Sequence, residues 1–207
     1  MENIWLNYAK RLQSIAETGL VYTKDKYDRE RYSEVSNIAA QMISYLGNIP
    51  VERIQNLLSK HSKGYVTPKV DVRGAVFRKN KILLVQEKAD NLWTLPGGFA
   101  DVGFSAAENI EKEIKEEAGI SVKAHRLFSI RHKAKGNFDQ DARDFYKLYF
   151  ICDQIDDSDL KPGLEILNAG YFGEDEIPPL STGRVLEEDL NLAWRFSRNA
   201  GEQTFFD

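Results

Sequence analysis

The stretch GGFADVGFSAAENIEKEIKEEAGI, residues 97–120, begins as a glycine-rich turn and continues as a helix dense in acidic residues. Glu113, Glu116 and Glu117 are three and four positions apart, so the helical period places them on one face. Like charges stacked in this way repel each other and weaken an isolated helix, which favours a cation between them. Clustered carboxylates are ligands for hard ions such as Mg²⁺ or Mn²⁺. The alternative is a solvated acidic helix face, the usual role of an acidic run.

The residues on either side of the acidic run predict where this helix begins and ends. Ser105, with Glu108 three residues later, forms the pattern of a capping box at the first turn. Gly119 supplies the left-handed residue that commonly ends a helix. Gly97 and Gly98 allow a tight turn in which the backbone approaches a ligand closely. The stretch therefore predicts a turn and a helix that together face a metal ion.

This stretch resembles the Nudix box, the signature of hydrolases that cut nucleoside diphosphates linked to another group. The family pattern is glycine, five residues, glutamate, seven residues, then Arg-Glu-apolar-x-Glu-Glu-x-Gly-apolar. Seven positions match this pattern: Gly98, Glu113, Ile114, Glu116, Glu117, Gly119 and Ile120. Phe104 and Lys112 replace the family's first glutamate and its arginine, which brace the helix as an ion pair. We expect Phe104 to brace the loop by packing and catalysis to be retained; an inactive box is the alternative.

The resemblance implies an α+β fold, a Nudix α/β/α sandwich with a mixed sheet, preceded here by a small N-terminal helical domain. We predict a helical domain for packing or dimerisation over 1–63, a linker over 64–69 and the Nudix domain over 70–207. The thin core of three short helices favours packing on the next domain or on a second copy, as in a homodimer. A DNA-binding helix-turn-helix is the weaker alternative, because residues 51–63 are only weakly basic.

Apolar periodicity predicts the individual elements. The first helix is expected to stop at Gly19 and the second to run from Tyr32 to Gly47. The expected strands cover 70–78, 81–87, 121–133, 146–152 and 165–172, with a turn at Asn80, a long functional or mobile loop over 133–145 and a last helix over 182–199. Ser181 or Thr182 can cap that last helix. The tail after it is expected to be weakly ordered unless its two phenylalanines dock.

Several residues outside the box are candidates for the site. Arg73 lies within a predicted strand, where a buried arginine needs a partner: it either pairs with Asp71 or holds a phosphate. Gln86 and Lys88 lie at a strand end, where a groove usually opens, and Glu165 is the best candidate for the carboxylate that the family often recruits from outside the box. The predicted roles are catalysis for Glu116, Glu117 and Glu165, metal binding for Glu113, Glu116, Glu117 and Gly98, and substrate binding for Arg73, Gln86, Lys88 and Gly97.

The composition restricts the class of partner. The 207 residues carry a formal net charge of −4, so a basic surface for nucleic acid is not expected. Cys152 is the single cysteine, which excludes a disulfide framework, and no apolar run reaches the length of a membrane span. A reducing cytoplasm fits these features.

The predicted function is metal-dependent hydrolysis of a nucleoside diphosphate derivative to a nucleoside monophosphate and a phosphorylated product, with Mg²⁺ or Mn²⁺ as cofactor. CDP-choline-like substrates come first, because the N-terminal arrangement resembles a subgroup with that activity. ADP-ribose or a nucleotide sugar is the first alternative. The second is a catalytically silent regulator that binds nucleotide or DNA.

Overall fold

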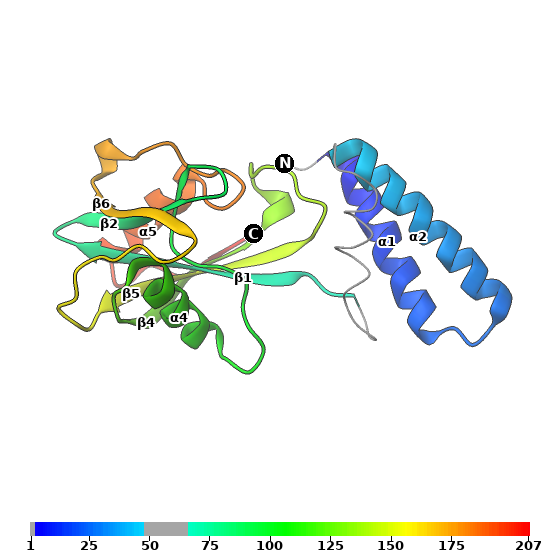
Figure 1. The fold of residues 1–207 in the computed structure, drawn as a ribbon, viewed down its shortest axis with the longest axis horizontal. Coiled ribbons are helices and arrows are strands. Elements are labelled where there is room, and N and C mark those ends of the chain that lie inside the picture. The colour runs from blue at the N-terminus through cyan, green and yellow to red at the C-terminus, as the bar shows by residue number, and fades with distance from the viewer. Residues whose placement is uncertain (1–2, 48–65) are drawn as a thin grey trace. The chain divides into compact units, whose positions relative to one another are not determined.

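The computed structural model describes residues 3–47 and 66–207 (Figure 1). The chain forms two compact units, Met1–Lys69 with Ala134–Phe145, and Val70–Lys133 with Tyr146–Asp207. The segment Ala134–Phe145, most of the predicted long loop, therefore belongs with the N-terminal helices rather than with the sheet. The predicted third helix lies outside the described residues, as does the start of the predicted linker. The boundaries at residues 63 and 70 stay a prediction.

The N-terminal unit contains two long helices that lie side by side, α1 (Ile4–Tyr22) and α2 (Lys26–Gly47) (Figure 1). Their buried apolar residues form one cluster with a residue of the loop: Leu6, Ala9, Ala40, Ile43 and Ala142. Gly19 does not stop α1. A Cβ at Gly19 would lie 2.6 Å from the Tyr32 ring, so this glycine allows close approach of the two helices.

The second helix begins six residues before the predicted start at Tyr32. The carboxylate of Asp25 accepts a hydrogen bond from the Asp28 amide at 2.9 Å and so satisfies a free donor of the first turn. The predicted start at Tyr32 was therefore wrong, because most of the polar stretch before it belongs to α2. Such a stretch is compatible with a helix whose outer face is solvated.

The other unit is built on a seven-stranded mixed sheet. Its strands are β1 (Lys69–Arg78), β2 (Lys81–Glu87), β3 (Trp93–Thr94), β4 (Val122–His132), β5 (Phe145–Gln154), β6 (Ile166–Phe172) and β7 (Phe205–Phe206). The order is β3-β2-β1-β5-β4-β7, and β6 pairs with β2. Lys79 and Asn80, with φ of 51° and 63°, make the predicted tight turn between β1 and β2. Two 3₁₀ turns, η1 (Lys133–Lys135) and η2 (Glu174–Glu176), lie in the connections.

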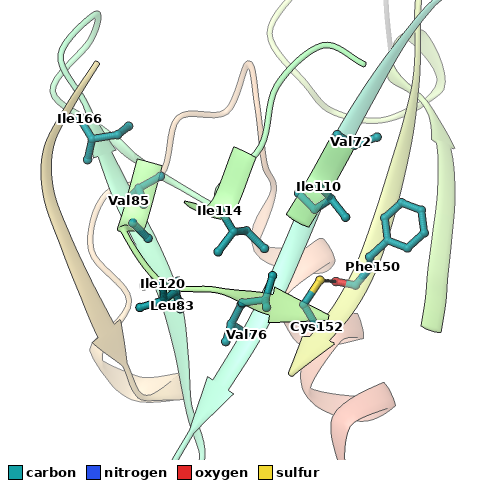
Figure 2. Packing of buried hydrophobic residues seen from close by; sticks show 12 residues of the cluster. Val72, Val76, Leu83, Val85, Ile110, Ile114, Ile120, Phe150, Cys152 and Ile166 are labelled. Atoms are coloured by element: carbon teal, nitrogen blue, oxygen red, sulfur yellow. Dashed lines mark hydrogen bonds between the residues drawn. The ribbon is translucent and has the colours of Figure 1, made fainter. Parts of the chain in front are cut away.

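One helix covers each face of this sheet, which confirms the predicted sandwich. Helix α4 (Ala106–Ala118) packs on the face that carries Val72 and Val76, shown in Figure 2. Helix α5 (Glu187–Arg198) packs with Ala75 on the opposite face. Successive residues of β1 therefore alternate between two buried faces, as the sequence predicted.

The C-terminal segment differs from the prediction at the start of its helix. Ser181 does not cap α5, because its hydroxyl donates to Asp90 at 2.7 Å. The helix starts at Glu187, where the Asp189 carboxylate accepts from the Leu186 amide at 2.9 Å. The tail docks through β7, which pairs in parallel with β4. Within the described residues, no helix is both long and apolar enough to span a membrane.

Candidate metal and pyrophosphate site

The box helix α4 has the ends that its sequence predicted. The Ser105 hydroxyl accepts from the Glu108 amide at 3.2 Å, and the Glu108 carboxylate accepts from the Ser105 amide at 2.7 Å. At the other end, Gly119 adopts φ of 78° and its amide donates to the Lys115 carbonyl at 3.1 Å. These local contacts fix the helix on which the three acidic residues are carried.

Close packing holds α4 against the sheet and against a loop. A Cβ at Gly74 would lie 2.6 Å from Ile114 Cδ1, so this glycine lets the helix approach β1. Near the helix end, the Gly163 amide donates to the Glu117 carbonyl at 3.0 Å. A Cβ at Gly163 would lie 1.9 Å from the Glu116 carbonyl oxygen. The loop around Gly163 therefore fixes the backbone from which Glu116 and Glu117 project, a contact that the sequence analysis missed.

The glycine turn runs beside β1 and faces the acidic side of α4. The Val72 amide donates to the Gly98 carbonyl at 2.8 Å, and that oxygen keeps a second lone pair for another partner. Gly97 has φ of 140°, and a Cβ there would lie 2.0 Å from the Val72 carbonyl oxygen, so only glycine fits. A Cβ at Gly98 would lie 3.1 Å from Glu113 Oε2, which places the Glu113 carboxylate against the turn.

The three acidic side chains of the box have different surroundings. Glu117 Oε2 accepts a hydrogen bond from the Gly97 amide at 2.8 Å. Glu116 is more exposed, with 58% of its side chain accessible, and Glu116 Oε1 lies 3.8 Å from Lys112 Nζ. Across residues 3–47 and 66–207, neither Glu113 nor Glu117 has a Lys, Arg or His nitrogen within 4.0 Å. Two partly buried carboxylates thus lie beside the turn without a protein cation in direct contact.

This arrangement raises the proton affinity of both carboxylates. Burial raises the pKa of Glu117 to about 8; the positive charge of Arg73 and the Gly97 hydrogen bond oppose this rise, and the negative charges of Glu87 and Glu113 add to it. Burial, followed by the charge of Glu116, raises the pKa of Glu113 above its ordinary value. A cation bound between these groups would stabilise their ionised forms and so oppose both shifts.

The donor atoms fit a hard divalent ion in kind. Carboxylates and the Gly98 carbonyl are oxygen ligands of the type that Mg²⁺ and Mn²⁺ take. In the part of the chain that the structure describes, however, no three His, Cys, Asp or Glu side chains converge on one point. Glu117 is turned toward Gly97 and Glu116 toward Lys112, so binding of an ion requires rotation of these side chains.

Phe104 does not brace the box loop, contrary to the expectation from its sequence position. Its side chain is 52% exposed, and Lys112 Nζ lies 5.8 Å from the centre of its ring. Lys112 pairs instead with Asp101 at 2.7 Å. The buried Asn109 accepts from the Asp101 amide at 2.8 Å and donates to the carbonyls of Asp101, Phe104 and Ser105. Asn109 and the Lys112–Asp101 pair therefore replace the family's ion pair.

Arg73 makes the structural ion pair, one of the two roles that the sequence left open. Its guanidinium holds the Asp71 carboxylate with two bonds, of 3.0 Å and 2.9 Å, and Arg73 is only 4% exposed. It also donates to the Leu95 carbonyl at 3.1 Å. A direct contact of Arg73 with substrate stays a prediction.

The remaining predicted residues lie around the end of β2. Gln86 donates to the Asn91 carbonyl at 2.9 Å and accepts from Asn168 at 2.6 Å. Lys88 is exposed, its ammonium donates to the Leu164 carbonyl, and its amide donates to the Glu165 carbonyl at 3.0 Å. Glu165 is also exposed. The roles of these residues in binding or catalysis stay predictions.

Glu87, which was not among the predicted site residues, is a further acidic residue close enough to act on Glu117. It ends β2, is 8% exposed, and its charge adds to the rise in the pKa of Glu117. Arg184 Nε lies 3.2 Å from its carboxylate, and the same guanidinium pairs with Asp90 at 2.7 Å. The signal in the sequence was an acidic residue at the end of an apolar strand, where burial requires a partner.

The comparisons with known proteins place the chain in a family. Residues 67–190 match the family model described as the NUDIX domain, which covers more than half of the chain. The chain belongs to the Nudix hydrolase family. In this Nudix hydrolase, residues 3–58 also match a model described as a UDP-X-like, N-terminal oligomerisation domain.

Two relatives align with nearly the whole chain, and a third aligns with about two thirds of it. A Bacillus subtilis (strain 168) protein named "Putative ADP-ribose pyrophosphatase YjhB" is 43% identical over 98% of this chain and 97% of its own. The crystal structure of a UDP-X diphosphatase covers 99% of this chain and 98% of its own, with 32% identity and a TM-score of 0.64. An ADP-ribose pyrophosphatase from Streptococcus suis 89-1591 is 42% identical over 68% of this chain and all of its own, with a TM-score of 0.62.

Proposed function

We propose that this Nudix hydrolase uses Mg²⁺ or Mn²⁺ to hydrolyse the pyrophosphate bond of a nucleoside diphosphate derivative. The observation that carries the proposal is the pair of partly buried carboxylates, Glu113 and Glu117, beside the Gly97–Gly98 turn, with no protein cation in direct contact. Burying a carboxylate without a counterion is unfavourable, so the arrangement is consistent with a site for an ion supplied from solution.

The residues of the chain have separable tasks in this proposal. Glu113, Glu116, Glu117 and the Gly98 carbonyl hold the ion, which supplies neutralisation of phosphate charge and an acidified water. The candidates that take a proton from the attacking water are Glu116, Glu117 and Glu165. Gln86, Lys88 and the Gly97 amide are the candidates for substrate contacts.

The substrate we propose first is ADP-ribose, giving AMP and ribose 5-phosphate. Two relatives that are more than 40% identical to this chain are named for ADP-ribose, and one of them aligns along nearly all of it. A UDP-linked compound comes second, because of the UDP-X diphosphatase that shares the full-length arrangement. CDP-choline, which led on the sequence resemblance, has no support from these relatives and becomes the third candidate.

We also propose that the protein is a homodimer formed through its N-terminal helices. The support is the match of residues 3–58 to an oligomerisation domain. The exposed apolar side chains of Trp5 and Ile15 on α1, each 60% accessible, are consistent with a covered face. The cytoplasmic location stays a prediction.

The test is a substrate panel with product identification. The pure protein, with Mg²⁺ or Mn²⁺, is incubated with ADP-ribose, a UDP-sugar and CDP-choline, and both products are identified by mass spectrometry. We expect AMP and ribose 5-phosphate as the fastest products, and loss of turnover in Glu117→Gln. A folded protein that hydrolyses none of these compounds contradicts the proposal. Tight nucleotide binding without turnover would instead support the silent regulator.

A further inference from the structure

A buried cluster of three charged side chains lies next to the glycine turn, and these side chains have no assigned role in the proposed reaction. Asp71 and Arg73 on β1 and Lys147 on β5 are 5%, 4% and 2% exposed. Lys147 Nζ lies 2.7 Å from Asp71 Oδ1, and the Arg73 guanidinium takes both oxygens of the same carboxylate. Burying three charges is costly for stability unless each is held by good hydrogen bonds. Each of the three charges therefore depends on its hydrogen bonds to the others.

Arg73 reaches beyond its ion pair to the segment that leads into the turn. Its Nη1 donates to the Leu95 carbonyl at 3.1 Å, while its Nε and Nη2 are used on Asp71. Leu95 directly precedes Pro96, Gly97 and Gly98. The planar fork of arginine can bind a carboxylate and a carbonyl at once in fixed directions, which the single ammonium of lysine cannot do.

The glycine turn carries the backbone groups that face the carboxylates of Glu113 and Glu117. The Gly97 amide donates to Glu117 at 2.8 Å, and Gly98 lies against the Glu113 carboxylate. The polar contacts therefore run from the buried ion pair through Arg73 to Leu95, and from the turn to Glu117. The positive charge of Arg73 also acts on both carboxylates, in the direction that favours their ionised forms.

We propose that Arg73 is a positioning residue of the pyrophosphatase site, which holds the Leu95–Gly98 turn in register with the carboxylates of α4 rather than binding a phosphate itself. This inference rests on the proposed function. It assigns Asp71 and Lys147 the task of fixing the Arg73 fork. Neighbours that orient the ligands of a metal commonly change metal affinity or activity by 10- to 100-fold when they are altered.

The test compares Arg73→Lys with Arg126→Lys. Arg126 is a matched control because its guanidinium also donates to backbone carbonyls, those of Phe196, Asn199 and Glu202, near the C-terminal end of α5. Three quantities are measured: the Mn²⁺ dissociation constant, by electron paramagnetic resonance without nucleotide, and kcat and KM with ADP-ribose. Circular dichroism establishes that each variant is folded at the assay temperature.

For Arg73→Lys we expect the Mn²⁺ dissociation constant to rise and kcat to fall, each by about tenfold or more, with KM within about threefold. For Arg126→Lys we expect the Mn²⁺ dissociation constant, kcat and KM all to stay within about twofold of wild type. Wild-type values for Arg73→Lys would overturn the inference, because the charge alone would then suffice. A rise in KM with unchanged kcat and Mn²⁺ binding would also overturn it, since that is the pattern of a phosphate contact.

Asp71→Asn provides a second route if Arg73→Lys does not fold. This substitution weakens the hold on Arg73 without replacing a residue of the turn. We therefore expect the Mn²⁺ dissociation constant to rise and kcat to fall, each by about threefold or more. Unchanged Mn²⁺ binding in Asp71→Asn would overturn the inference. If wild type binds Mn²⁺ but hydrolyses nothing, the proposed function fails, while the Mn²⁺ comparison still decides the role of Arg73.

Discussion

Glu117→Gln is expected to stabilise the metal-free protein at alkaline pH while it abolishes activity. The folded protein raises the pKa of Glu117 from the ordinary 4.5 to about 8, mainly by burial, so the folded state binds this proton more tightly than the unfolded state does. The stability that the proton contributes is complete below about pH 4.5 and is lost as the pH rises through about 8. Glutamine has a similar shape, can keep the Gly97 hydrogen bond and does not ionise.

The size of this effect follows from the two pKa values. A rise from 4.5 to about 8 corresponds to about 5 kcal/mol at 1.36 kcal/mol per pKa unit. Relaxation of the site and entry of water around the charge reduce this figure. As the pH rises from about 4.5 to about 8.5, we therefore expect the unfolding free energy of Glu117→Gln to increase by about 2–3 kcal/mol relative to that of wild type.

The assay is urea unfolding of both proteins in EDTA across this pH range. The control is Glu116→Gln, whose native side chain is 58% exposed, and for which we expect a difference that changes by less than about 0.5 kcal/mol. Saturating Mg²⁺ should then stabilise wild type by about 2.7 kcal/mol at 100 times its dissociation constant, and Glu117→Gln by much less. A difference between Glu117→Gln and wild type that is independent of pH, or of opposite sign, would refute the reasoning.

Three further perturbations test the support of the site. Gly163→Ala places a Cβ against the Glu116 carbonyl oxygen, so it should reduce kcat and, in a urea titration, lower the unfolding free energy by about 1–3 kcal/mol. The control Gly201→Ala should stay within about 0.5 kcal/mol of wild type in the same titration. Asn109→Ala removes the bonds that hold the box loop and should cost about 2–3 kcal/mol; equal urea midpoints for Asn109→Ala and wild type would contradict that role. Lys112→Ala breaks an exposed pair and should leave the urea midpoint close to that of wild type, so a loss of stability as large as that of Asn109→Ala would contradict this expectation.

Much of the fold could be predicted because its signals are local in the sequence. Ser105, Glu108 and Gly119 mark the ends of α4 through contacts within a few residues, and the structure shows those contacts. Apolar periodicity predicted a strand over 70–78, and the structure has β1 there, with Val72 and Val76 on one buried face and Ala75 on the other. Signals of this kind do not depend on what the rest of the chain does.

The errors occurred where a distant residue decides the role of a local signal. Gly19 resembles a helix stop, but it serves the contact with Tyr32 on the other helix. Ser181 resembles a helix cap, but its hydroxyl is held by Asp90 from a different loop. Phe104 could not brace the loop from its exposed position, and Asn109, which gave no motif signal, does so.

The candidate site shows the same division between local and distant signals. The acidic positions of α4 and the glycine turn were readable from spacing alone. The ion pair of Arg73 was one of two options, and its reach to Leu95 depends on how β1 lies beside the turn. The Gly163 amide supports the end of α4 at the Glu117 carbonyl, and these two residues are more than 40 positions apart in the sequence.

The most direct test of the central claim is a crystal structure of the protein soaked in Mn²⁺, read by anomalous scattering. The account predicts an anomalous peak between the Glu113 and Glu117 carboxylates and the Gly98 carbonyl, with Glu117 turned away from the Gly97 amide. A saturating soak that leaves no peak there, with Glu117 still bonded to Gly97, would contradict it.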